Sequence, residues 1–209
     1  RISDLAFEDA LVKLPNRNSF LSVLDQRQPG MDVLALVDID DFADINSVLD
    51  QEFGDAVLQA VACRLRQSFT EGVKIARIGN DVFGIIGAHD EVNPQRIESV
   101  FSIPFEVAEE RFRLSATTGL LQLTDEPDKA VELLKNASVA LKQAKSFHRG
   151  KALYFEAAYA SSARSRMQML NRLRQAFSAE RLFLVYQPFI ELASGRVVGA
   201  EALLRWRTE

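Results

Sequence analysis

Apolar and polar positions follow two periods along the chain, and together they predict a mixture of strands and helices. Residues 33–37 are uninterrupted aliphatic side chains, typical of a strand buried on both faces, and three carboxylates follow within residues 38–41. Apolar residues between 56 and 65 recur at helical spacing. Residues 74–78 and 82–86 predict a hairpin closed by a Gly-Asn-Asp turn.

The remaining segments complete the same plan. Ser3 is expected to cap a first helix that ends before Pro15, because the residue before a proline is steered away from helical angles. Short connections and hairpin reversals favour a two-layer α+β domain with a mostly antiparallel central sheet flanked by helices. The other expected elements are helices at 17–24, 94–101 and 127–147 and strands at 104–108, 111–123 and 151–155.

The C-terminal part has a different pattern. Residues 157–180 predict a basic connecting helix, and residues 182–192 and 196–206 predict two strands around a Ser-Gly turn. Two strands do not make a domain by themselves. We therefore expect a first domain at 1–156, the connecting helix, and the beginning of another domain at 181–209. The helix carries an apolar stripe made of Met167, Leu170, Leu173 and Phe177.

Charge is divided unevenly along the chain. The formal net charge is −4, yet residues 1–135 carry −11 and residues 136–209 carry +7. Such an asymmetry often marks a change of role between parts of a chain. The basic run at 142–151 has no aromatic stacking platform, so we expect a solvated helix there and no nucleic-acid partner.

Composition narrows the class and the location. Apolar residues make up 47% and charged residues 26%, which excludes a disordered or fibrous chain. The longest apolar runs are far shorter than the roughly 18 residues of a membrane span, and no signal-peptide pattern opens the chain. We expect a cytoplasmic location without membrane contact, although a parent protein could be membrane-attached. Cys63 lacks a partner for an internal disulfide and is expected to be a small buried apolar group.

Carboxylates gather where two of the predicted strands meet their turns. Asp38 and Asp40 alternate with Ile39, so extended geometry places both carboxylates on one side and Ile39 on the other. Asp81 lies on the hairpin turn, and if the hairpin lies beside the first strand, Asp38 and Asp81 converge as hard oxygen ligands for Mg²⁺. The alternative is that Asp38 and Asp40 cap the following helix and that Asp81 only serves the turn.

Residues 77–83, Arg-Ile-Gly-Asn-Asp-Val-Phe, resemble the Arg-x-Gly-Gly-Asp-Glu-Phe signature of GGDEF domains, the diguanylate cyclases. Residues 9–17 are similar to the family's N-terminal motif, residues 38–55 to its metal and guanine segment, and residues 140–149 to its closing helix. These segments agree in order and spacing over about residues 5–155. The resemblance implies the nucleotidyl-cyclase, palm-like fold.

The resemblance also implies a role for each matching residue, with GTP as the nucleotide partner and Mg²⁺ as the cofactor. For the two cations of the closing helix, Lys145 and Arg149, a solvated helix face remains the alternative. The implied metal ligands are Asp38, the carbonyl of Ile39 and Asp81, and the implied nucleotide ligands are Asn46 and Asp55 for guanine and Lys145 and Arg149 for the triphosphate.

Several positions depart from the family's pattern. Val82 stands where the signature has Glu, and an aliphatic side chain neither binds metal nor helps to activate the attacking hydroxyl, so we expect no catalytic residue. Asn80 replaces the second Gly of the signature, and residues 70–73 lack the Arg-x-x-Asp of the family's inhibitory product site. The other departures are Ala43 for Lys, Ser47 for Asp, Asp50-Gln51 for Gly-His, Lys142 for Tyr and His148-Arg149-Gly150 for the closing Gly-Arg-Asn.

A second, shorter resemblance lies near the C-terminal end. Residues 186–188, Tyr-Gln-Pro, and residues 199–206 resemble the opening of an EAL domain, the cyclic di-GMP phosphodiesterase. In that family the Glu of the motif, here Glu201, binds a catalytic metal. The later strands, helices and acidic ligands of such a barrel do not follow, so residues 181–209 are expected to be the first strands of an incomplete EAL barrel.

These features favour a catalytically degenerate GGDEF domain that binds GTP and regulates an adjoining EAL phosphodiesterase. Two alternatives remain. One is a weakly active diguanylate cyclase that makes cyclic di-GMP from two GTP molecules across a homodimer. The other is a structural or dimerisation module without nucleotide, for which the apolar stripe of the connecting helix is the partner surface.

Overall fold

The computed structural model describes the backbone of residues 7–124 and 128–207, and the side chains of all of these except residues 162–164. Ser3, the expected cap of the first helix, lies outside the described residues. The chain separates into two compact units, Arg1–Ala160 and Ser161–Glu209.

A five-stranded sheet forms the centre of the first unit. The strands are β1 (Val33–Ile39), β2 (Lys74–Arg77), β3 (Val82–Gly87), β6 (Ala116–Gln122) and β7 (Ala152–Tyr154), in the order β2-β3-β1-β6-β7. Every neighbouring pair is antiparallel except β6 and β7, which are parallel. The aliphatic run at the start of β1 therefore lies in the middle of the sheet, where both of its faces are buried.

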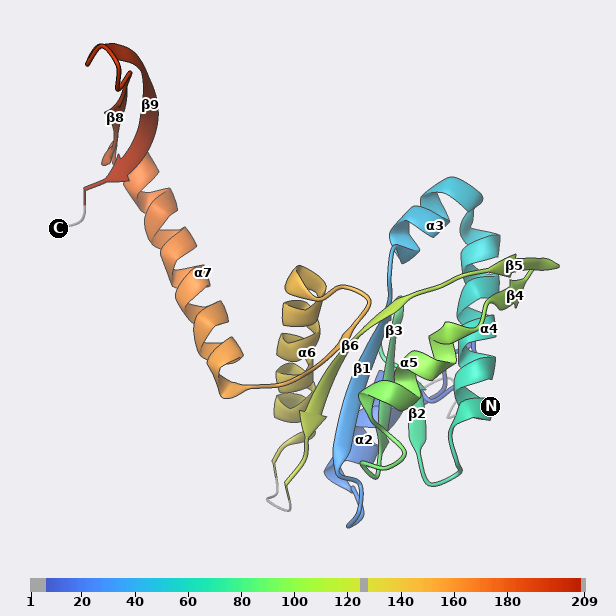
Figure 1. The fold of residues 1–209 in the computed structure, drawn as a ribbon. Helices are drawn as coiled ribbons and strands as arrows, with labels where there is room; N and C mark the ends of the chain where they lie inside the picture. Colours follow the sequence, from blue (N-terminus) through green and yellow to red (C-terminus); the bar gives the residue numbers. More distant parts are fainter. Residues whose placement is uncertain (1–6, 125–127, 208–209) are drawn as a thin grey trace. The chain divides into compact units, whose positions relative to one another are not determined.

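Helices cover both faces of this sheet (Figure 1). α2 (Arg17–Asp25) and α6 (Ala130–Phe147) pack on one face, and α4 (Gln51–Ser68) and α5 (Pro94–Ser102) pack on the other. Side chains of β1 alternate between the two cores. This α+β domain, with a mixed and mostly antiparallel sheet flanked by helices, confirms the predicted fold class.

α6 lies unusually close to the sheet. A Cβ atom at Gly119 of β6 would lie 2.2 Å from the backbone nitrogen of Leu141 on α6, so glycine is needed there. α6 also contacts β1. This close packing allows side chains from the last turns of α6 to reach the carboxylates at the end of β1.

Two smaller features differ from the predicted boundaries. The expected strand over 111–123 is divided, because β5 (Glu110–Phe112) pairs with β4 (Phe105–Val107) and β6 begins only at Ala116. A short helix, α3 (Phe42–Leu49), fills the segment between β1 and α4. It carries part of the candidate site.

The expectation that Cys63 is buried is wrong. It lies on the exposed side of α4, where Gln67 Nε2 donates to its Sγ at 3.5 Å. The buried positions around it are Ala62, directly before it, and Val61 and Leu65, each two residues away. Because a helix turns by about 100° per residue, a position midway between two buried ones faces the opposite side.

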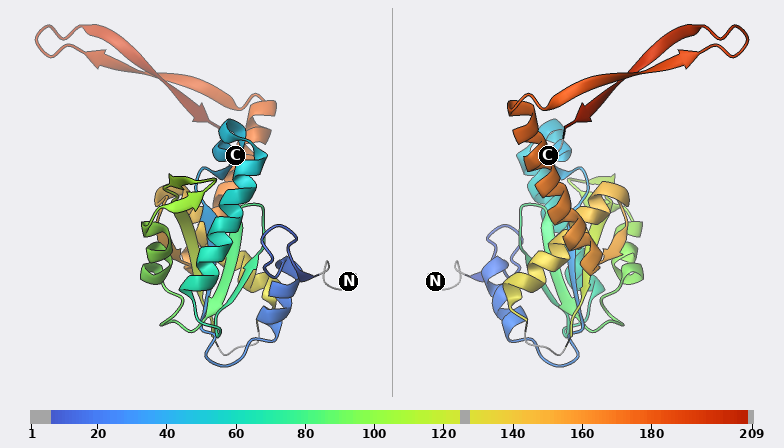
Figure 2. Two further views of the ribbon diagram at one scale, coloured as in Figure 1. Left: turned by 90° about the vertical axis from the view of Figure 1, so that its right-hand side faces the viewer. Right: turned by 90° about the vertical axis from the view of Figure 1, so that its left-hand side faces the viewer.

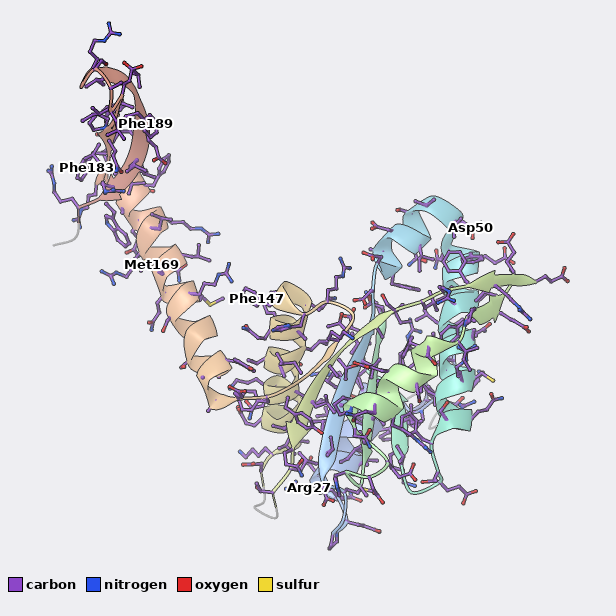
Figure 3. All side chains as sticks on the ribbon, in the orientation of Figure 1. Arg27, Asp50, Phe147, Met169, Phe183 and Phe189 are labelled. Atoms are coloured by element: carbon purple, nitrogen blue, oxygen red, sulfur yellow. The ribbon has the colours of Figure 1, made fainter. Side chains whose placement is uncertain are left out.

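α7 (Ala157–Ser178) leads into the second unit, where β8 (Leu182–Ile190) and β9 (Val197–Trp206) form an antiparallel hairpin, as predicted. Figure 2 shows these strands as a twisted ribbon, and the described residues form no closed barrel. Many apolar side chains of this unit are exposed, and Figure 3 labels Met169, Phe183 and Phe189 among them. The predicted stripe of Met167, Leu170, Leu173 and Phe177 is exposed as well.

Candidate functional site

Two buried carboxylates mark the point where β1 leaves the sheet. Asp38 and Asp40 are each 5% exposed, and Ile39 between them packs in the opposite core, on the side of α4. The alternative that Asp38 and Asp40 cap the next helix is wrong. The residue before α3 is Asp41, and its side chain makes no capping hydrogen bond. The two buried carboxylates instead interact with cations from α6 and the turn after it.

Lys145 of α6 holds the Asp38 carboxylate. Its Nζ lies 2.8 Å from Oδ1 and 2.8 Å from Oδ2. Burial raises the pKa of Asp38 above its ordinary value, the ammonium of Lys145 acts in the opposite direction, and the nearby charge of Asp81 raises it further. Asp38 is thus a buried carboxylate, and its negative charge needs a cation beside it.

Asp81 comes from the hairpin between β2 and β3. Its backbone carbonyl accepts the Ile39 amide at 3.1 Å, so the turn is fastened to the end of β1. The structure therefore brings Asp38, Ile39 and Asp81 to one place, as the hairpin argument predicts. The charge of Asp81 raises the pKa of Asp38, so the two carboxylates interact electrostatically.

The chemistry of the donors at the end of β1 suits Mg²⁺. Both side-chain donors are carboxylate oxygens, which hard cations prefer. Within residues 7–124 and 128–207, no group of three or more His, Cys, Asp or Glu could hold a metal ion. Mg²⁺ commonly takes only one or two carboxylates and completes its shell with water and phosphate oxygens. The donor set therefore fits Mg²⁺ in the company of a phosphate.

Arg149 follows α6 and meets the second buried carboxylate. Its Nε lies 3.5 Å from Asp40 Oδ1, and its Nη2 donates to Asp41 Oδ1 at 2.7 Å. Asp40 also accepts the hydroxyl of Ser115 at 2.8 Å and that of Thr117 at 2.6 Å. Lys145 and Arg149 thus lie against carboxylates at and just after the end of β1 and are not on a purely solvated face.

The two expected guanine ligands form a second group on α3 and α4. Asn46 Oδ1 is buried and has no hydrogen-bond partner in the described part of the chain. A Cβ atom at Gly54 would lie 1.8 Å from this oxygen, so only glycine leaves room for the Asn46 amide. Asp55 follows Gly54 and is half-buried. A buried amide oxygen without a partner is costly, which makes it a place where a ligand could supply a donor.

Asp50 joins α3 to α4 (Figure 3). Its φ is 96°, in the left-handed region that favours glycine, and glycine is the residue that the resemblance leads us to expect there. Its Oδ1 accepts the Phe53 amide at 2.9 Å and caps α4, which offsets part of the backbone strain. This departure therefore preserves the local turn.

Arg77, the first residue of the signature, has a structural partner that sequence reasoning missed. Its Nη1 lies 3.2 Å from both oxygens of Asp9, and its Nε donates to the Asn80 carbonyl at 3.2 Å. Asp9 also accepts the amides of Leu11 and Val12. Residues 8–14 therefore form a turn, and the expected first helix is wrong there. The signal was present, because both partners lie in segments that resemble the family's motifs.

Two further residues singled out from the sequence, Val82 and Glu201, lie in different units of the chain. Val82 pairs with Asp38 across neighbouring strands and packs against the core on the α6 side. Glu201 is exposed on β9, opposite Gln187 of β8, in the second unit. In the described residues no helix is long and apolar enough to cross a membrane.

Comparison with known families gives two matches along the chain. Residues 6–151 match the family model described as diguanylate cyclase, GGDEF domain, and residues 170–209 match the EAL domain model. These ranges follow one another without overlap. The first covers most of the unit that contains the carboxylate and amide groups.

Curated relatives match along almost the whole chain. MucR of Pseudomonas aeruginosa, a bifunctional diguanylate cyclase/cyclic di-GMP phosphodiesterase, is 32% identical over 97% of this chain and 31% of its own length. NbdA of the same organism, a cyclic di-GMP phosphodiesterase, is 32% identical over 99% of this chain and 28% of its own length. The chain thus spans about a third of the length of these relatives.

Solved structures agree with the fold of the first unit. The GGDEF domain of YfiN (TpbB) from Pseudomonas aeruginosa has a TM-score of 0.65 and 26% sequence identity. The alignment covers 75% of this chain and 99% of that one. The similarity therefore extends over a complete GGDEF domain.

Proposed function

Because the chain belongs to the GGDEF family of cyclic di-GMP signalling proteins, and residues 170–209 match the EAL family, we propose that it contains a degenerate, regulatory GGDEF domain. We propose limits of 1–156 for this domain, 157–180 for the connecting helix and 181–209 for the beginning of an EAL phosphodiesterase. GTP is its proposed ligand and the cytoplasm its proposed location. The meeting of Asp38 with Lys145 at the end of β1 carries the proposal.

The phosphate end of the proposed site is supported by the two cations. The side chains of Lys145 and Arg149 are 40% and 53% exposed while they contact carboxylates. Phosphate oxygens can therefore approach both groups from solvent. A guanidinium suits a phosphate by presenting two parallel donors, and an ammonium acts as a point charge.

Asp38, Asp81 and the Ile39 carbonyl are the proposed Mg²⁺ ligands. The metal would neutralise and orient the phosphates of the nucleotide. With Mg²⁺ on Asp38, Lys145 would no longer be needed to neutralise this carboxylate, and its ammonium would be available to the triphosphate. We expect GTP to bind more tightly with Mg²⁺ present than without it.

The guanine end of the proposed site is supported by Asn46 and Asp55. The unpaired Asn46 oxygen can accept a donor from the base, and the two side-chain oxygens of Asp55 can accept the ring N–H and amino group that distinguish guanine from adenine. We therefore expect GTP to be preferred over ATP.

Val82 supports the absence of turnover. Its register opposite Asp38 puts its side chain on the same face of the sheet, and directly opposed side chains are neighbours. The Glu expected in the signature would add a carboxylate at this point, whereas valine adds only apolar surface. The retained residues thus favour binding over catalysis.

The test is calorimetric titration of this chain with GTP in the presence of Mg²⁺, with ATP as the comparison. Lys145→Gln should weaken GTP binding by about tenfold, the value of one charge-assisted hydrogen bond. Lys142→Gln is the matched control, because this lysine is exposed one turn earlier on α6. If the wild type releases no heat at high micromolar GTP, the binding proposal fails.

A weakly active cyclase remains the second candidate, because Asp81 is retained beside Asp38. Incubation with GTP and chromatography for cyclic di-GMP tests it. Val82→Glu combined with Asn80→Gly restores the signature and is the informative comparison. Product from the wild type would replace the regulatory proposal with an enzymatic one.

A dimerisation module without nucleotide is the third candidate, and the exposed stripe on α7 favours it. Met167 and Phe177 are 66% and 73% exposed, so a second copy would remove much apolar surface from water. Light scattering over a range of concentrations measures the oligomeric state and distinguishes this candidate from the nucleotide-binding ones. A monomer that binds GTP well would exclude this candidate.

A further inference from the structure

Asp40 is a buried carboxylate for which the proposed metal and nucleotide roles have no use. Its side chain is only 2% exposed. Oδ1 accepts the Thr117 hydroxyl and Oδ2 accepts the Ser115 hydroxyl. A buried carboxylate is costly unless it is hydrogen-bonded and paired with a cation. The cation that faces Asp40 is Arg149.

A second connection leads from Asp40 to the turn after α6, which also contains Arg149. The Thr117 hydroxyl has one hydrogen, which it donates to Asp40, and its oxygen accepts the Gly150 amide at 2.9 Å. Thr117 is fully buried, and Gly150 has a φ of 74°, a left-handed conformation that closes the turn after α6. Asp40 therefore contacts Arg149 directly and Gly150 through Thr117.

Asp41, the other carboxylate that contacts Arg149, differs from Asp40 because it is exposed to solvent. Its side chain is 58% exposed and pairs with the outer nitrogen Nη2 of Arg149. A phosphate can replace that exposed contact while the buried contact at Nε remains. The outer edge of the guanidinium is thus the part available to a ligand.

We propose that Asp40 is a positioning residue. Together with Ser115 and Thr117 it holds the turn after α6 so that the outer edge of Arg149 faces the triphosphate. This inference rests on the proposed function and deepens it, because it assigns the buried carboxylate to the phosphate end of the site. Asp40 itself does not touch the nucleotide.

Titrations of Asp40→Asn with GTP and with GMP in Mg²⁺ test the inference. GTP should bind about tenfold more weakly, and GMP, which lacks the outer phosphates, should stay within about twofold of the wild type. The double variant with Arg149→Gln should bind GTP no more weakly than Arg149→Gln alone, because residues that act through one another are not additive. An equal loss for GMP, or a further tenfold loss in the double variant, would overturn the inference.

Asp25→Asn is the matched control for this series. Asp25 is also a carboxylate that holds α6, since its Oδ1 accepts the Ala130 amide at 3.0 Å, but it does so at the other end of the helix. The same chemical change there should leave GTP binding unchanged. A loss as large as that of Asp40→Asn would mean that any loosening of α6 suffices, which contradicts a specific role for Asp40.

The link can also be measured without nucleotide. Melting temperatures of Asp40→Asn, Arg149→Gln and the double variant form a cycle, and coupled residues should depart from additivity. If the wild type binds no GTP, the proposed function fails, whereas additive melting temperatures overturn the positioning role of Asp40. Should Asp40→Asn fail to fold, Thr117→Val takes its place, and Thr117→Ser, which keeps the hydroxyl, should restore GTP affinity.

Discussion

Gly54→Ala separates the stability of α4 from the binding of guanine. The new Cβ would lie 1.8 Å from Asn46 Oδ1 and 2.9 Å from its Cγ, but 3.4 Å from Phe42 Cζ, which is ordinary contact. The Asn46 amide must therefore move by roughly 1.5–2 Å to reach van der Waals distance. The atom that moves is the end of a side chain, so the backbone of α3 can stay in place.

The expected effects on folding and binding have different sizes. In a helix interior, alanine is more favourable than glycine by up to about 1 kcal/mol, which offsets the cost of moving Asn46. We expect the free energy of unfolding to change by less than about 1 kcal/mol, or a few degrees in melting temperature. GTP should bind about tenfold more weakly, because one hydrogen bond to the base is lost.

Thermal unfolding and calorimetric titration with GTP measure the two effects. Gly72→Ala is the matched control, because a Cβ there meets nothing closer than Thr70 Oγ1 at 3.8 Å. Wild-type GTP affinity in Gly54→Ala would refute the placement of Asn46 at the guanine. A large loss of stability would instead show that the Asn46 side chain cannot move away from the new Cβ.

Three further predictions concern charge and exposure. Burial raises the pKa of Asp38, so this residue should make the folded wild type less stable as pH rises from the ordinary carboxyl pKa of 3.8 through the raised pKa. Thermal melts across this pH range should show the loss in the wild type but not in Asp38→Asn. A contribution of Asp38 that rises with pH would contradict the prediction. Asp9→Ala should lower the free energy of unfolding, measured with denaturant, by about 2 kcal/mol, because it breaks a mostly buried pair with Arg77. Glu132→Ala breaks an exposed pair with Lys135 and should lower it by less than about 0.5 kcal/mol. Equal losses would refute this prediction. Cys63 should react with a thiol reagent in the native protein, and a requirement for denaturant would contradict its exposure.

Local patterns predicted the elements well where each element depends on its own residues. The apolar run of β1, the Gly-Asn-Asp turn and the stripe of α7 needed no knowledge of distant residues. Where neighbouring signals overlapped, the boundaries were less accurate. α4 begins at Gln51 because Asp50 caps it, although the apolar repeat that predicts this helix covers only residues 56–65.

The sequence by itself determined which chemistry is available: two carboxylates in alternation on a central strand, a third on a hairpin turn, and a signature with valine in place of glutamate. Only the tertiary structure decided how these groups are paired. Lys145 meets Asp38 across 107 residues and Arg77 meets Asp9 across 68. Such contacts depend on how closely α6 packs on the sheet and on which strands are neighbours. Local periodicity contains no information on either, because it reports only which face of an element is buried.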